Sequence, residues 1–206
     1  MFLKRKLAPK KVFQCKIHHE NNEAPMFLAE NVKLLLPNLL NRPIVIVCIG
    51  TDRSTGDSLG PLVGTKLSER TSFPFKVYGT LDDPVHAMNL DEKLKMIKKN
   101  HPNAFIIGID ACLGRLNHVG MISVGEGPVK PGAGVNKELP PVGDIHMTGI
   151  VNVSGFMEYF VLQNTRLSIV MKMATLIANS LVIVARHFSQ YQLSSGLQKD
   201  DLYNIQ

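Results

Sequence analysis

Hydrophobic positions along the chain alternate between short continuous apolar runs and apolar residues at helical spacing, which predicts alternating strands and helices. The continuous runs are apolar on both faces, as is typical of parallel strands that helices cover on both sides. The predicted strands span residues 44–49, 75–80, 104–109, 119–124 and 145–153. The predicted helices span residues 24–40 (broken at Pro37), 57–70 and 90–100 (capped by Asn89), and Ser154 caps a last helical region.

This alternation predicts an α/β fold, a three-layer α/β/α sandwich with a mostly parallel central sheet. A chain of 206 residues is typical of one domain. We expect a basic flexible extension over residues 1–23, a single domain over residues 24–190 and a C-terminal tail over residues 191–206.

The net charge of +6 lies in the predicted extension, because residues 1–19 hold six Lys or Arg and no acid. This extension has no base-reading motif and no interleaved aromatic residues, so we expect no sequence-specific nucleic-acid binding. The apolar run at residues 167–185 contains Lys172 and Asn179, which favours a helix buried against the sheet over a membrane span. Three cysteines without a paired framework predict a reducing compartment, the cytoplasm.

Two acidic residues stand next to predicted strand ends: Asp57 begins the helix after the first buried strand, and Asp110 directly follows the predicted strand 104–109. The carboxyl ends of neighbouring parallel strands share one crevice, so we expect the two carboxyl groups to meet there. One of two adjacent carboxyls holds a proton while the other acts as a base, which suits hydrolysis by an activated water.

Other interpretations of these acids stay open. Asp57 and Asp110 could hold a divalent metal ion, with His146 as a third ligand, or each could be a local helix cap or turn residue. Cys112 lies two residues beyond Asp110 and could be a nucleophile or a packing residue. The glycines of the loop at residues 130–135 permit a close approach of the backbone to a bound chain, although the loop could equally be a plain connector.

Several separated motifs resemble, in order and spacing, those of the germination protease of spore-forming bacteria. They are Gly56-Asp57-Ser58-Leu59-Gly60-Pro61, then Ile109-Asp110-Ala111 with Arg115, then Ile122-Ser123, and then Pro131-Gly132-Ala133-Gly134-Val135. The overall match is to the YyaC-type sporulation proteins, a spore-protease-like family, and the more distant one is to the hydrogenase maturation proteases. The resemblance covers about residues 44–155. The chain departs from the germination protease at Glu126, where that protease has Asp, and over residues 144–153.

The resemblance implies a phosphorylase/hydrolase-like fold and an atypical aspartic endopeptidase whose catalytic residues are Asp57 and Asp110. With it we predict substrate binding by Arg115, Pro131, Gly132 and Gly134. The likeness to the hydrogenase maturation proteases implies Asp57, Asp110 and His146 as the metal ligands, if a divalent metal takes part; no other cofactor is expected.

We therefore expect a cytoplasmic peptidase of the sporulating cell or spore core that acts on a protein or peptide, such as the small acid-soluble spore proteins. No membrane partner is expected, and the chain could form a homo-oligomer. One alternative is a catalytically inactive protein that binds a peptide or partner on the same fold. Another is a hydrolase that depends on Cys112.

Overall fold

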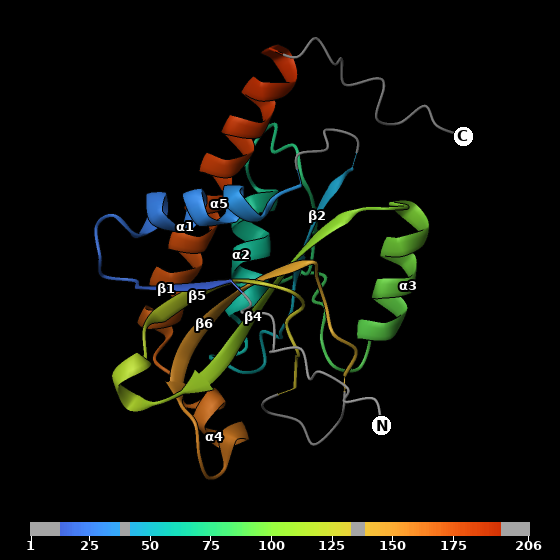
Figure 1. The fold of residues 1–206 in the computed structure, drawn as a ribbon. Helices are drawn as coiled ribbons and strands as arrows, with labels where there is room; N and C mark the ends of the chain where they lie inside the picture. Colours follow the sequence, from blue (N-terminus) through green and yellow to red (C-terminus); the bar gives the residue numbers. More distant parts are fainter. Residues whose placement is uncertain (1–12, 38–41, 133–138, 195–206) are drawn as a thin grey trace, which may run out of the picture.

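The computed structural model describes residues 13–37, 42–132 and 139–194. One six-stranded sheet runs through the fold in the order β1-β5-β6-β4-β2-β3 (Figure 1). Its strands are β1 (Gln14–His18), β2 (Ile44–Cys48), β3 (Lys76–Tyr78), β4 (Phe105–Gly114), β5 (Met121–Glu126) and β6 (Ile145–Val153). Neighbouring strands from β6 to β3 are parallel, whereas β5 is antiparallel to both β6 and β1. The mostly parallel sheet is as predicted.

Helices lie on both faces of this sheet, which confirms the three-layer α/β/α architecture (Figure 1). The helices are α1 (Ala24–Leu35), α2 (Leu59–Ser68), α3 (Leu90–Asn100), α4 (Glu158–Gln163) and α5 (Leu167–Ser194), with a short 3-10 helix η1 (Leu116–His118). In β2, Ile44, Ile46 and Cys48 pack with α1, α2 and α5. The alternate residues Val45 and Val47 pack with α3.

Helix α5 is long and apolar enough to cross a membrane, by length and composition, over Leu167–Gln190. Half of its most apolar stretch is buried inside the fold. Met173, Ile177 and Leu181 are fully buried in the core, whereas Lys172 and Asn179 are exposed. The amphipathic pattern is that of a helix covering a sheet, as predicted for this run.

The start of the predicted domain is wrong, because residues 14–18 form strand β1 and belong to the sheet instead of a flexible extension. Cys15 and Ile17 turn toward the core and pair with Val124 and Ile122 of β5, while Lys16 between them is exposed. Period-two alternation of this kind is typical of a half-buried strand. Helix α5 also continues through Ser194, beyond the predicted domain end at residue 190.

Several further boundaries differ from the sequence prediction. Helix α2 begins at Leu59, so Asp57 lies in the loop before it and does not begin the helix. Strand β4 does not end before Asp110 but continues to Gly114, because β6 pairs with it over that whole length. Ser154 does not cap the C-terminal helical region, since α4 begins after Met157, whose backbone is left-handed with φ 57°.

Candidate functional site

Asp110 lies at the point where β4 extends beyond its neighbour β2. The last paired residues of the two strands are Ile109 and Cys48, so Asp110 is the first residue past the end of β2. Ile109 and Ala111 belong to the core beneath α1, α2 and α5. Because successive side chains of a strand point to opposite faces, Asp110 lies on the face that α3 covers.

Asp57 is placed by the loop that connects β2 to α2. The backbone N–H of Thr51 donates a hydrogen bond of 3.2 Å to the Asp57 carbonyl, which folds the loop back on itself. Gly50 has φ +141°, and a Cβ there would lie 1.9 Å from the same carbonyl oxygen. Only glycine allows this approach, so Gly50 fixes where the loop brings Asp57.

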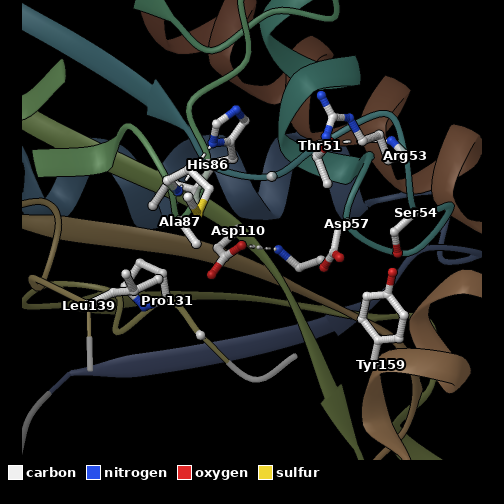
Figure 2. A pocket seen from close by; sticks show the side chains of 15 residues that line it. Thr51, Arg53, Ser54, Asp57, His86, Ala87, Asp110, Pro131, Leu139 and Tyr159 are labelled. Atoms are coloured by element: carbon white, nitrogen blue, oxygen red, sulfur yellow. Dashed lines mark hydrogen bonds between the residues drawn. The ribbon is translucent and has the colours of Figure 1, made fainter. Parts of the chain in front are cut away.

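The two acids line one pocket of about 270 Å³. Figure 2 shows both of their side chains in the centre of this cavity. Its walls come from the loop at residues 49–57, the segment 86–88, residues 131–132, Leu139 and Tyr159 of α4. Asp57 and Asp110 therefore line one pocket at the end of β2, where the rule for parallel sheets places ligand sites.

The charges of the two acids are coupled. Burial, and next to it the negative charge of Asp57, raise the pKa of Asp110 well above its usual value. The Ala111 N–H donates a hydrogen bond of 2.9 Å to Asp110 Oδ1 and acts in the opposite direction. Burial also raises the pKa of Asp57, and the hydroxyl of Ser54 lowers it. Asp110 thus keeps its proton more strongly, and Asp57 ionises first.

Ser54 completes the inner wall of the pocket. Its Oγ is buried and has no hydrogen-bond partner within the usual geometric limits among the described residues, so its interaction with Asp57 is a weak one. Figure 2 shows the Tyr159 hydroxyl turned toward Ser54. Gln163 Nε2 donates a hydrogen bond of 2.9 Å to that hydroxyl. The side of the pocket next to Asp57 is therefore polar, because the hydroxyl groups of Ser54 and Tyr159 lie there.

The structure brings some of the predicted substrate-binding residues to the pocket and not others. Pro131 and Gly132 line it, with φ +119° at Gly132. Gly134 lies outside the described residues. Arg115 is exposed at the start of η1 and is not among the residues that line the pocket. The structure does not place Arg115 in this pocket, and its role in substrate binding stays a prediction.

His146 does not join the two acids. It lies on β6 next to Gly108 of β4, but its ring covers Gly125 of β5, where a Cβ would lie 2.6 Å from it. Its Nδ1 is 2.9 Å from the Gly127 carbonyl oxygen. Among the described residues, no three His, Cys, Asp or Glu side chains form a group that could hold a metal ion. The predicted trio with His146 is therefore not assembled.

His86, Arg53 and Tyr159 line the pocket and were not predicted as site residues. His86 arrives there because Val85 pairs with Ile49 and accepts a hydrogen bond of 2.8 Å from Gly50 N–H. The β-branched Val85, between Pro84 and His86, is the local signal in the sequence that this segment returns to the sheet. No comparable local signal places Tyr159.

Cys112 is not poised as a nucleophile. Burial, and next to it the charge of Asp110, raise the pKa of its thiol to about 11. Cys112 is not among the residues that line the pocket. Since the thiolate is the nucleophilic form, a thiol with this pKa is almost entirely unreactive near neutral pH.

Comparisons with known proteins find one relative, one structural neighbour and one family. The chain is 59% identical over 175 residues to "Uncharacterized protein YyaC" of Bacillus subtilis (strain 168), which covers 83% of this chain and 85% of that protein. It is similar to the crystal structure of the NiFe hydrogenase maturation protease HycI from Thermococcus kodakarensis KOD1, with a TM-score of 0.39 and 18% identity over 68% of this chain and 92% of that one. The family described as "Protein of unknown function (DUF1256)" matches residues 16–180, and the chain therefore belongs to this family.

Proposed function

We propose that this protein is a peptidase that hydrolyses peptide bonds with Asp57 and Asp110. The observation that carries the proposal is the pairing of these acids, from two different elements, in one pocket where the charge of Asp57 raises the pKa of Asp110. A protonated acid beside an ionised one provides a general acid and a general base at the same time.

The reaction needs only the two acids and one water. The Asp57 carboxylate takes a proton from the water, whose oxygen attacks the carbonyl carbon of the substrate, while Asp110 gives its proton to the carbonyl oxygen. The resulting tetrahedral diol collapses when Asp57 returns its proton to the amide nitrogen and Asp110 takes one from a diol hydroxyl. The C–N bond breaks, the products are a carboxylic acid and an amine, and both acids regain their starting protonation states without an acyl-enzyme.

Backbone groups near Gly132 are suited to hold the substrate. Gly132 has no side chain, and its positive φ turns the chain at the wall of the pocket. An extended polypeptide can approach such a backbone closely and pair with it by hydrogen bonds. The substrate-binding role of Pro131 and Gly132 is part of this proposal.

The setting of the reaction is proposed from the motif resemblance. The order of the Asp57, Asp110 and Pro131 motifs resembles the germination protease. We therefore place the peptidase in the cytoplasm of the sporulating cell or in the spore core, with small acid-soluble spore proteins as substrates.

Cleavage by the purified protein tests the function. Small acid-soluble spore proteins and casein are incubated with the wild type across acidic to neutral pH, with and without divalent cations, and the products are identified by mass spectrometry. Asp57→Asn and Asp110→Asn should each lower the rate by on the order of 10³-fold or more, with unchanged circular dichroism. Peptide binding without turnover that Asp110→Asn leaves unaffected would instead support an inactive binding protein.

A further inference from the structure

Helix α4 and the turn before it expose an unusual number of large apolar side chains. Phe156 is 89% exposed, and Met157, Tyr159 and Phe160 are each about half exposed. Met88, from the segment 86–88, is 86% exposed. We call these five residues the rim patch. Four of the five lie within residues 156–160, and Met88 and Tyr159 both line the pocket. Groups of exposed apolar side chains mark interaction sites, whereas single ones are ordinary.

The rim patch is continuous with the pocket of the two acids. Tyr159 and Met88 both belong to the patch and both line the pocket. Figure 2 shows Ala87, the chain neighbour of Met88, and Tyr159 on opposite sides of Asp57 and Asp110. A chain that passes over the acids therefore meets apolar side chains on both sides.

One side of α4 is attached to the rest of the fold by hydrogen bonds, so its other side faces outward. The backbone N–H of Gly56, the residue before Asp57, donates a hydrogen bond of 2.8 Å to the Leu162 carbonyl. Asn152 Nδ2 donates to the Val161 carbonyl and to Thr165 Oγ1, each at 3.2 Å. Leu162 itself is buried. Since this side of the helix is fixed on the loop of Asp57, Tyr159 keeps a defined place at the wall of the pocket.

The turn before α4 adopts its shape at a cost. Met157 has φ 57°, a left-handed backbone that is unfavourable for a residue with a side chain. Glycine or asparagine would take this conformation more easily, yet a half-exposed methionine stands there. Met157 therefore places an apolar side chain on the surface although its backbone conformation is strained.

We propose that the rim patch binds large apolar side chains of an extended polypeptide whose backbone passes over Asp57 and Asp110. The inference rests on the proposed function and specifies its substrate: segments with aromatic or large aliphatic residues on both sides of the cleaved bond. The pocket, at about 270 Å³, is near the lower end of the range of about 300–1,000 Å³ typical of small-molecule sites. A pocket of this size suits the residues next to the cleaved bond, and the flanking side chains of a longer segment then lie over the rim patch.

Charge and position favour a polypeptide over other occupants. Residues 156–160 contain one acid, Glu158, and no basic residue, whereas helices that lie on anionic membranes carry Lys and Arg. A second copy of the chain seated on the patch would stand next to the pocket and hinder access to both acids. A substrate segment uses the patch and the pocket together.

Binding without turnover tests the patch separately from catalysis. The full chain carrying Asp110→Asn is titrated with two fluorescein-labelled peptides, one of alternating Phe and Ser and one of alternating Gly and Ser, and fluorescence anisotropy is measured. The Phe peptide should bind at least about tenfold more tightly. Adding Phe156→Gln and Phe160→Gln should weaken its binding about five- to tenfold, which is the effect of losing partly buried apolar contacts.

A matched control separates the patch from apolar exposure in general. Leu34 on α1 is 75% exposed and does not line the pocket, so Leu34→Gln in the same background should leave binding of both peptides unchanged. Circular dichroism of every variant checks the fold.

Three results would overturn the inference. The first is equal binding of the Phe peptide with and without the two patch substitutions. The second is a loss of dimers on sedimentation of the patch variant while peptide binding stays the same, and the third is binding of anionic lipid vesicles but not of peptide. If no protein substrate is cut but peptide binding depends on the patch, the result supports the role of the patch and contradicts the peptidase proposal. If cleavage occurs and the patch substitutions leave its KM unchanged, the result supports the peptidase proposal and contradicts the role of the patch.

Discussion

Burial and, next to it, the negative charge of Asp57 raise the pKa of Asp110, although Asp57 comes from the loop before α2 and Asp110 from strand β4. The pair therefore gives up its first and second protons at different pH values. A coupled pair of this kind has pKa values that belong to both groups together.

The first prediction concerns the pH dependence of cleavage. The proposed reaction needs an ionised Asp57 and a protonated Asp110, so kcat/KM should follow a bell-shaped curve. Activity should fall at low pH as Asp57 takes up a proton, and at high pH as Asp110 loses one. Initial rates on a fluorogenic peptide across the pH range check this. A rate that keeps rising through alkaline pH would contradict the role of Asp110 as an acid.

The second prediction concerns stability. Because the folded-state pKa of Asp110 is raised, the folded protein binds this proton more tightly than the unfolded chain does. The free energy of unfolding therefore falls as pH rises from the ordinary Asp pKa through the folded-state value. Asp110→Asn removes the buried carboxyl and keeps the oxygen that accepts from Ala111 N–H. It should raise the Tm by a few degrees near neutral pH and have little effect in strong acid.

Thermal unfolding of Asp110→Asn and wild type at several pH values measures this difference. The exposed Asp82 provides the control, since Asp82→Asn should show no such gain. A wild type more stable than Asp110→Asn at neutral pH would show that Asp110 is not a buried carboxyl with a raised pKa.

The third prediction concerns Cys112. Its thiol pKa of about 11 leaves very little thiolate near neutral pH. Treatment with iodoacetamide, or the substitution Cys112→Ala, should therefore leave cleavage within about twofold of the untreated wild type. Rates before and after alkylation, with the extent of modification from mass spectrometry, check this. A loss of activity in proportion to the modification of Cys112 would instead support the alternative of a hydrolase that depends on Cys112.

The fourth prediction concerns the contact between α2 and β2. A Cβ on Gly60 would lie 2.1 Å from the Ile49 carbonyl oxygen, which is backbone and cannot turn aside. Gly60→Ala should force α2 away from the sheet and lower the free energy of unfolding by about 1–3 kcal/mol. It should lower activity as well, because Asp57 stands just before this helix. Urea unfolding measures the effect, and Ser68→Ala at the exposed end of α2 is the control that should leave stability nearly unchanged.

Much of the sheet could be predicted from the sequence because its central strands are continuous apolar runs. Strand 145–153 was predicted with the bounds that β6 has. The end of β4 could not be predicted: an acid after an apolar run usually marks a turn, but here β6 supplies a partner as far as Gly114. The short strand β1 was missed because it depends on pairing with β5.

The sequence likewise predicts some residues of the candidate site and not others. The meeting of Asp57 and Asp110 could be predicted, because it follows from where parallel strands end. Tyr159 could not, since it reaches the pocket only through the packing of α4 on Gly56. His146 is on the predicted strand, but the Gly127 carbonyl and the space above Gly125 decide where its ring lies, and neither is visible in the sequence.

The two outermost strands of the sheet are short, with five residues in β1 and three in β3. Few unpaired N–H and C=O groups are thus available to a strand from another molecule, which protects the described part of the chain against edge-to-edge aggregation. The polypeptide substrate that we propose accordingly gains little by lengthening the sheet at its edges. Contacts above the strand ends, and not a repeating ladder along an edge strand, would decide which sequences are accepted.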